Sequence, residues 1–199
     1  MPDGTKTLTK EQLRQRAREK LAALTLAEAR AGSAAIWERL SVLGEFSAAA
    51  RLLIYVSTGS EVDTHGLIRQ LLAMGRQVCV PRFEPVTQSY VACQVRDFDA
   101  DLATGKFGIL EPRPKAVQPA AIDPIGAVLV PGLAFDETGN RLGRGLGCFD
   151  RLLRQTSGVK IALAFDFQLL DEVPAEPHDV RMDFIVTETR VVNPRGNRQ

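Results

Sequence analysis

The sequence predicts an α/β fold: a single-domain, layered, Rossmann-like arrangement with a largely parallel central sheet flanked by helices. Short apolar runs typical of buried strands recur along the chain, and helix-like segments separate them. The chain has 199 residues, of which 45% are hydrophobic, enough for one domain with a substantial core. We therefore expect one domain over residues 1–199, with flexible tails at 1–8 and 193–199.

Two helices are predicted at the N-terminus. Thr9 followed by Gln12 fits a capping box that opens the first helix. Apolar residues then recur at helical spacing at Leu13, Ala17, Leu21 and Leu24. A second helix is expected from about Ala27 to Leu43, with Ile36, Trp37 and Leu40 facing inward.

The middle of the chain alternates strands and helices. Residues 51–56 read as a buried strand, and a Ser-Thr-Gly-Ser turn separates them from a helix over 64–74. Residues 77–81 read as the next strand, and the alternation in 89–98 is typical of a half-exposed strand. Since ligands bind beyond the carboxyl ends of parallel strands, the turn after Val56 lies at the expected site edge.

The remaining strands are expected at 126–130, 159–165 and 184–186. The segments that follow Val130 and Phe165 fall at the same edge of the sheet. Residues 99–124 contain many turn formers and little periodicity, so this stretch is expected to be a flap or an insertion.

Composition excludes several classes of protein. A formal net charge of +1 is not that of a general nucleic-acid binder. No apolar run approaches the ~18 residues that span a bilayer, and the polar N-terminus lacks the centre of a signal peptide. Cys79, Cys93 and Cys148 form no C-x-x-C pair, which indicates reduced thiols. We expect a cytoplasmic protein without nucleic-acid or membrane partners.

The richest candidate site is the glycine loop, residues 139–147, which precedes a helix expected to start near Gly147 or Cys148. Glycines let backbone N–H groups turn toward an oxyanion, and a helix start adds partial positive charge. Arg141 and Arg144 add forked cationic donors. Asp150 fits a Mg²⁺ ion that bridges to phosphates. The alternative is a tight turn followed by an acid that favours the helix dipole.

Other candidates are weaker on residue pattern alone. Glu61 follows a strand, but its pattern alone favours a solvated loop acid or a helix cap. Lys10 and Arg14 share one helical face, which favours a solvated basic surface. His178-Asp179 is either a catalytic or metal-binding pair or a surface turn.

The segment VPGLAFDETGNRLGRGLGCFDRLL resembles the signature of the 5-formyltetrahydrofolate cyclo-ligases, also called 5,10-methenyltetrahydrofolate synthetases. The likeness extends over most of the chain. Further segments resemble family motifs in the same order, at residues 10–14, 60–64, 107–112, 164–168 and 173–179.

The resemblance implies that ATP and Mg²⁺ serve as cofactors and that 5-formyltetrahydrofolate is the small-molecule partner. In such enzymes ATP phosphorylates the formyl oxygen, N10 attacks the activated carbon, and phosphate leaves, giving 5,10-methenyltetrahydrofolate and ADP. A monomer is expected. The positions implied for ATP are Lys10, Arg14, Arg141, Leu142, Gly143, Arg144, Gly145, Leu146, Gly147, Cys148 and Phe149. Those implied for folate are Val56, Glu61, Phe107, Arg144, Gly145, Gly147 and Cys148, and those for Mg²⁺ are Asp150 and Asp179.

One departure concerns the pair of tyrosines that the family signature carries before its aspartate. Here Cys148 and Phe149 stand in their place. Unless another side chain fills the space, Cys148 leaves the folate pocket roomier and poorer by one hydroxyl. Two alternatives therefore stay open: a folate- or nucleotide-binding paralogue without turnover, and a related ATP-dependent ligase with a different substrate.

Overall fold

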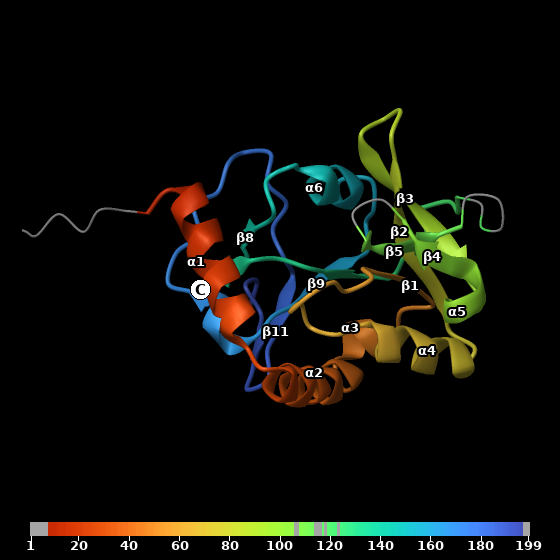
Figure 1. Ribbon diagram of the computed structural model, residues 1–199, viewed down its shortest axis with the longest axis horizontal. Coiled ribbons are helices and arrows are strands. Elements are labelled where there is room, and N and C mark those ends of the chain that lie inside the picture. The colour runs from red at the N-terminus through yellow and green to blue at the C-terminus, as the bar shows by residue number, and fades with distance from the viewer. Residues whose placement is uncertain (1–7, 106–107, 114–116, 118, 123, 197–199) are drawn as a thin grey trace, which may run out of the picture.

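The computed structural model describes residues 8–105, 108–113, 117, 119–122 and 124–196. Its centre is a seven-stranded sheet in the order β12-β11-β9-β6-β1-β2-β3 (Figure 1). Strands β11, β9, β6, β1 and β2 are parallel, while β12 and β3 pair antiparallel at the two edges. The prediction of a largely parallel sheet is confirmed. The strands are β1 (Arg51–Ile54), β2 (Gln77–Glu84), β3 (Ser89–Val95), β6 (Ala127–Val130), β9 (Val159–Leu163), β11 (Phe184–Val186) and β12 (Val191–Val192).

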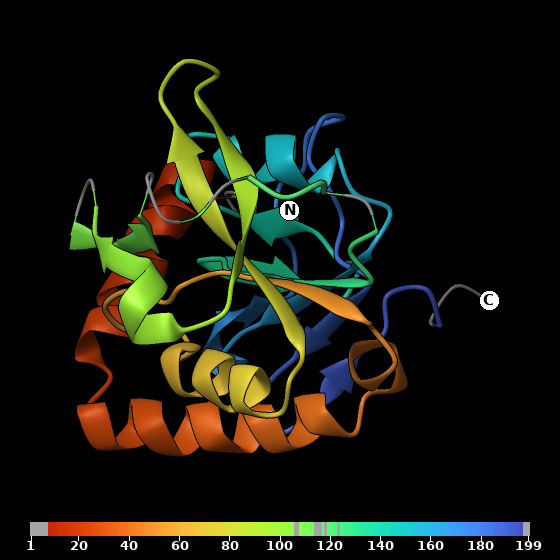
Figure 2. The same cartoon turned by 90° about the vertical axis from the view of Figure 1, so that its right-hand side faces the viewer.

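Helices cover both faces of this sheet. In Figure 1, α2, α3 and α4 lie below the sheet and α6 lies above it, while Figure 2 shows α2 running along the bottom. The helices are α1 (Lys10–Ala23), α2 (Leu26–Ser41), α3 (Gly44–Ser47), α4 (His65–Ala73), α5 (Phe98–Asp101) and α6 (Cys148–Leu153). In the described part of the chain, no helix has both the length and the apolar character needed to cross a membrane.

Capping residues fix where the first two helices start. Thr9 and Gln12 form the predicted capping box at the start of α1. Thr25 and Glu28 form a second capping box, which starts α2 at Leu26. The predicted helix over 27–43 is therefore correct in kind and displaced by one residue at its start.

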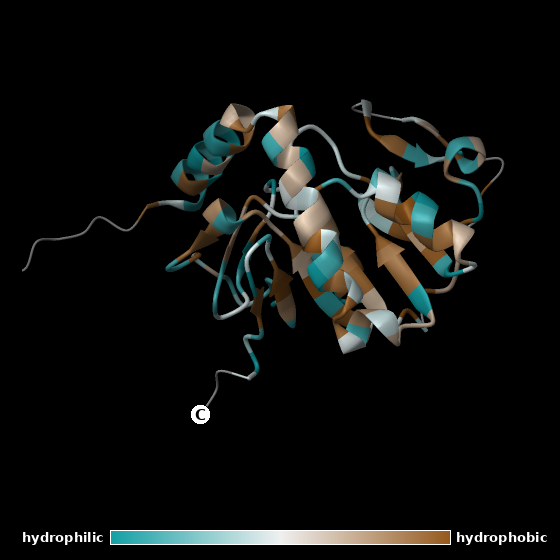
Figure 3. Cartoon of the chain, turned by 90° about the horizontal axis from the view of Figure 1, so that it is seen from below, coloured by the Kyte–Doolittle hydropathy of each residue, from teal (hydrophilic) through white to brown (hydrophobic). Residues whose placement is uncertain are grey.

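The core lies on both faces of the sheet. In β1, Leu52 and Ile54 face the larger apolar cluster with α2 and α4, whereas Leu53 faces the cluster with α6. Successive side chains point to opposite faces, so a strand covered on both sides must be apolar throughout. Figure 3 shows these strands as mostly brown behind helices of mixed polarity.

Several short elements were not predicted. Strands β7 (Ala134–Asp136), β8 (Arg141–Leu142) and β10 (Leu169–Leu170) form a small sheet in the order β10-β7-β8, and η2 (Asp166–Gln168) is a turn of 3₁₀ helix. The stretch expected to be a flap or an insertion contains the hairpin of β4 (Leu102–Thr104) and β5 (Leu110–Pro112). Arg141 and Leu142, assigned to the glycine loop from the sequence, thus belong to a strand.

Candidate active site

A cavity of about 340 Å³ opens where the strand order reverses, between β1 and β6. Val56 follows β1 and Gly132 follows β6, and both line the cavity. This is the place where open α/β sheets bind ligands, and the volume suits a small molecule. Every predicted site residue that the structure describes lines it: Lys10, Arg14, Val56, Glu61, residues 141–150 and Asp179. Phe107 lies outside the described residues.

Helix α1 closes one side of the cavity with its cationic face. Lys10 Nζ lies 2.8 Å from Glu176 Oε1 and 2.9 Å from Asp179 Oδ2. Arg14 Nε donates to the carbonyl oxygen of Gly143 at 3.1 Å, which docks the helix on the glycine loop. The side chains of Lys10 and Arg14 are only 23% and 19% exposed, so the solvated basic face suggested by their spacing is wrong.

The segment before the glycine loop is organised by one buried carboxylate. Asp136 Oδ1 accepts from the backbone N–H groups of Thr138 and Asn140, each at 3.0 Å. Its Oδ2 accepts from the backbone N–H of Val173 at 2.9 Å. Because Asp136 satisfies donors from two separate segments, it fixes the turn that leads from β7 into β8.

Two glycines with positive φ shape the end of the loop that leads into α6. Gly145 and Gly147 have φ angles of +109° and +62°, a region that side chains other than glycine rarely adopt. Gly147 is also the N-cap of α6, so the predicted helix start is confirmed. The left-handed residue turns the chain sharply, which brings α6 and its Asp150 back over the cavity.

Arg141 and Asp150 form a buried ion pair beside the cavity. Arg141 Nη2 lies 2.8 Å from Asp150 Oδ2, with side-chain exposures of 4% and 14%. Arg141 Nη1 donates to the Pro131 carbonyl at 3.2 Å. Its Nε is buried and has no hydrogen-bond partner among the described residues. The pair therefore holds the base of the loop in place and adds the positive charge of Arg141 behind the cavity wall.

A second ion pair crosses from the glycine loop to the segment after β1. Arg144 Nη2 lies 2.7 Å from Glu61 Oε1 and 3.0 Å from Thr58 Oγ1. The Thr58 backbone N–H donates to Glu61 Oε2 at 2.9 Å, so the carboxylate is held in a fixed orientation. Glu61 is 16% exposed, which is not the exposure of a solvated loop acid.

The turn at 176–179 lines the cavity beside Lys10 of α1. Burial works against a charged Asp179, but the Glu176 backbone N–H and the Lys10 ammonium together hold its pKa below the ordinary value. His178 Nε2 lies 3.7 Å from Asp179 Oδ1 and is 64% exposed. Asp179 is therefore a carboxylate at neutral pH, available to a cation or to Lys10.

The residues suggested for Mg²⁺ fit the chemistry of that ion. Asp150 and Asp179 present carboxylate oxygens to the same cavity. Across residues 8–105, 108–113, 117, 119–122 and 124–196, no group of three or more His, Cys, Asp or Glu side chains is placed to hold a metal. Mg²⁺ commonly uses one or two carboxylates, with phosphates and waters as its other ligands, so two acids are a suitable set.

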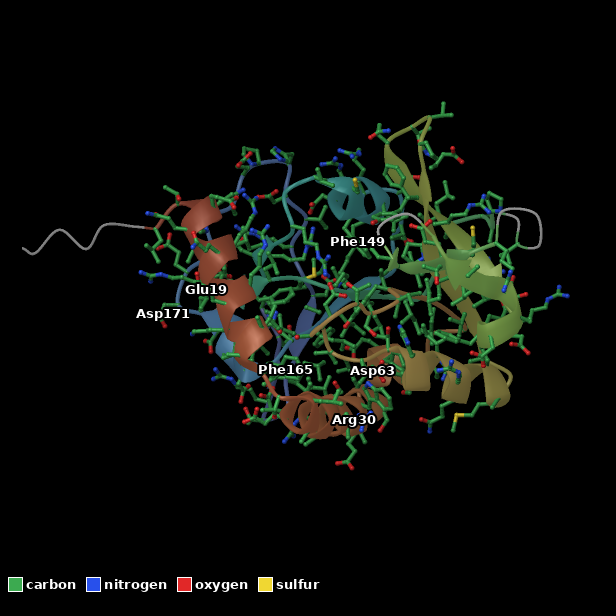
Figure 4. All side chains as sticks on the ribbon, viewed as in Figure 1. Glu19, Arg30, Asp63, Phe149, Phe165 and Asp171 are labelled. Atoms are coloured by element: carbon green, nitrogen blue, oxygen red, sulfur yellow. The ribbon has the colours of Figure 1, made fainter. Side chains whose placement is uncertain are left out.

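Sequence reasoning missed several residues of the cavity wall. Tyr90, from β3, lines the cavity, and its ring centroid lies 5.6 Å from that of Phe149. Figure 4 shows the Phe149 side chain on the side of α6 that faces the sheet. Glu111 also lines the cavity, and burial raises its pKa despite the nearby Arg82. Glu111 stands in a segment that carried the resemblance, whereas no signal in the sequence distinguished Tyr90.

Comparison with known proteins agrees with this geometry. The model of the 5-formyltetrahydrofolate cyclo-ligase family matches residues 6–188. A 5-formyltetrahydrofolate cyclo-ligase of Mycolicibacterium smegmatis is 37% identical over 140 residues, covering 68% of this chain and 72% of the relative. The mouse enzyme of that name is 30% identical over 189 residues, covering 90% and 93%.

Among solved structures, a 5,10-methenyltetrahydrofolate synthetase of Aquifex aeolicus is similar with a TM-score of 0.85. It is 31% identical, and the match covers 96% of each chain. The match of the family model over most of the chain, the relatives at 30% identity or more and the shared fold lead to one conclusion. The chain belongs to the 5-formyltetrahydrofolate cyclo-ligase family.

Proposed function

We propose that this protein catalyses the ATP- and Mg²⁺-dependent cyclisation of 5-formyltetrahydrofolate to 5,10-methenyltetrahydrofolate, with release of ADP and phosphate. Membership of the family supports the reaction. The observation that carries the nucleotide part is the gathering of Lys10, Arg14 and Arg144 beside the glycine loop on the wall of one cavity. Cationic side chains and backbone N–H groups in such a loop are suited to bind phosphate oxygens.

ATP phosphates are assigned to the end of the cavity formed by α1 and the glycine loop. Lys10, Arg14 and Arg144 supply positive charge there, and Gly145 and Gly147 give the backbone the freedom to direct N–H groups inward. The loop residues 141–149 complete the proposed ATP contacts. Asp150 and Asp179 are the proposed Mg²⁺ ligands, and the ion would supply charge neutralisation to the phosphates.

The folate is assigned to the other end, where Val56 and Glu61 line the cavity. The fixed Glu61 carboxylate accepts hydrogen bonds from amino and ring N–H groups, which the pterin possesses. Phe107, Gly145, Gly147 and Cys148 complete the proposed folate contacts. The Arg144 guanidinium pairs with Glu61, so it stands between the two parts of the cavity and is assigned to both ligands.

The protein's role in such a reaction is mainly to position two substrates and to stabilise charge. The oxygen of an amide-like formyl group is a poor leaving group until it carries a phosphoryl group. After that transfer, N10 bonds to the formyl carbon, N10 loses its proton, and the carbon–oxygen bond breaks as phosphate departs. The cations of the glycine loop stabilise the negative charge that develops on the transferred and departing phosphate.

The test is direct. Protein, MgATP and 5-formyltetrahydrofolate are mixed, and methenyl absorbance is followed together with ADP release. We expect equal amounts of both products and no turnover without ATP or Mg²⁺. Asp150→Asn is expected to abolish turnover while Asp99→Asn, which alters an exposed acid paired with Arg69, retains it. Folate binding without product, or ADP release that ignores folate, would contradict the proposal.

We further propose that one domain over residues 1–199 acts as a monomer in the cytoplasm. The described residues assigned to ATP, folate and Mg²⁺ all line one cavity, which supports a single domain as the functional unit. Size-exclusion chromatography with light scattering tests the monomer, and an oligomer whose dissociation removes activity would contradict it.

A further inference from the structure

Tyr90 is held rigidly at the cavity wall. Its ring lies 5.9 Å from that of Phe83 on the neighbouring strand β2, in an edge-on arrangement at 76°. On its other side, the Phe149 ring of α6 lies at 5.6 Å and 59°. Aromatic pairs in these geometries are attractive, so the two neighbours restrict the Tyr90 side chain to one orientation.

Tyr90 combines a place at the cavity wall with a hydroxyl that has no partner in the described part of the chain. Tyr90 is half-buried and lines the cavity, and no residue in the described part of the chain hydrogen-bonds its hydroxyl. Burial raises the pKa of this phenol, with Cys148 and Glu111 also raising it and Arg144 lowering it. These three residues line the same cavity as Tyr90, so the phenol lies among groups that surround a bound ligand. A positioned phenol without a partner is suited to donate to a ligand.

Cys148 lies beside Tyr90 and turns its polar atom elsewhere. Its Sγ lies 3.7 Å from the carbonyl oxygen of Gln88, at the tip of the hairpin that carries Tyr90. Arg151 Nη2 lies 3.3 Å from the same sulfur and 2.6 Å from the Gln88 carbonyl. The small side chain at position 148 therefore leaves this part of the wall to the larger ring from β3.

We propose that Tyr90 is a specificity-determining residue that donates its hydroxyl hydrogen bond to the bound folate, and that Cys148 is small because Tyr90 occupies the space beside it. The inference rests on the proposed function. It replaces the sequence-based expectation that the pocket is roomier and poorer by one hydroxyl at this wall. The aromatic ring and the hydroxyl come from the hairpin instead of from α6.

The first experiment removes the hydroxyl alone. Tyr90→Phe keeps the ring between Phe83 and Phe149, so folding is retained, while the KM for 5-formyltetrahydrofolate is expected to rise about five- to tenfold. The KM for ATP is expected to stay unchanged, because the loop and α1 contact the nucleotide. Equilibrium binding of the folate without ATP gives a second readout. Ser89→Ala is the matched control, since it removes a hydroxyl from the same strand at a position outside the cavity lining.

The second experiment tests the shared space. Cys148→Tyr is expected to raise the folate KM, because its ring competes with Tyr90, and Tyr90→Ala in the same chain is expected to recover most of the loss. The two changes are therefore non-additive in a double-mutant cycle. Thermal unfolding of each variant separates these effects from loss of folding.

The outcomes separate the two proposals. If the parent protein neither binds nor cyclises 5-formyltetrahydrofolate, the proposed function fails and this inference fails with it. If the parent is active and Tyr90→Phe leaves the folate KM unchanged, or raises both KM values equally, only the inference is overturned. Additive effects of Cys148→Tyr and Tyr90→Ala overturn the shared-space part.

Discussion

Arg141 Nη2 and Asp150 Oδ2 lie 2.8 Å apart, and this ion pair joins strand β8 to the helix that follows the glycine loop. The two residues are nine positions apart in the sequence. The pair therefore closes the loop at its base, so that the backbone between them projects toward the cavity. The same two side chains are proposed to contact phosphate and Mg²⁺, which couples the stability of the loop to the binding of its ligands.

Removing Arg141 is expected to destabilise the protein strongly. Arg141→Met leaves Asp150 without its partner in a largely buried place, and breaking such a pair costs about 3 kcal/mol of unfolding free energy. Urea denaturation measures the loss. Arg69→Met is the control, because the Arg69–Asp99 pair is exposed and is expected to contribute little to stability. Equal losses in the two variants would show that burial of the Arg141 pair is unimportant.

The Arg144 side chain is expected to contribute to nucleotide binding and not to the stability of the fold. Its side chain is 57% exposed, so Arg144→Ala should unfold at the parent's temperature. A lost charge-assisted contact to phosphate costs about 1.5–3 kcal/mol, which weakens MgATP roughly 10- to 150-fold. Calorimetric titration measures the affinity, with Arg190→Ala as a control from an exposed surface pair. Unchanged ATP affinity on a folded variant would exclude the phosphate role.

Glu61→Gln is expected to weaken the binding of the folate substrate. The amide keeps the shape of the carboxylate but loses its charge, so folate KM should rise roughly tenfold while ATP affinity stays near that of the parent. Steady-state kinetics with each substrate varied in turn gives both values. Glu137→Gln, in the exposed pair with Arg190, serves as the control. If the variant matches the parent in folate KM and turnover, Glu61 does not contact the folate.

The three thiols are expected to differ sharply in reactivity. Cys79 and Cys93 are buried, whereas Cys148 is partly exposed at the cavity. Burial raises the pKa of Cys79 to about 11, with a smaller opposing effect of Arg51. At pH 8 about one in a thousand Cys79 side chains is then a thiolate. A chromogenic disulfide reagent should titrate one thiol in the native protein and three after denaturation. Three native thiols of equal reactivity would contradict this.

The raised pKa of Cys79 makes the stability of the protein depend on pH. The folded pKa of Cys79 lies above the value near 8.5 of an unfolded cysteine. Its contribution to stability is therefore complete below pH 8.5 and is lost as pH rises toward 11. Denaturation at a series of alkaline pH values follows this loss, and Cys79→Ala is expected to reduce the slope.

The sequence predicted those parts of the fold that are determined locally. The capping box at Thr9 determines the start of α1 through local hydrogen bonds. The apolar run at 51–56 indicates a strand that is buried on both faces. Strand β2 continues to Glu84, beyond its predicted end, because β3 pairs with it along its length. That pairing depends on a distant segment, which no local pattern reveals.

In the candidate site, too, local features were predictable and features that depend on distant segments were not. The position of the glycine loop was predictable, because glycines and arginines in this density ahead of a helix indicate an anion site. Tyr90 was not predictable, because its proposed role depends on Phe83 of β2 and on Phe149 and the small Cys148 of α6, two elements distant from it or paired with it only in the fold. The strands β7, β8 and β10 were missed for a related reason. Each has two or three residues and is defined by pairing across the chain.

Lys10 and Asp179 are separated by 169 positions, yet their side chains meet at the rim of the cavity. Helix α1 is therefore synthesised long before Asp179. Lys10 has no ion pair with Asp179 until the last part of the chain has been made. A chain truncated before Glu176 would thus lack both acidic partners of Lys10, and the start of α1 would be held at the cavity by the Arg14 contact with Gly143 without these ion pairs.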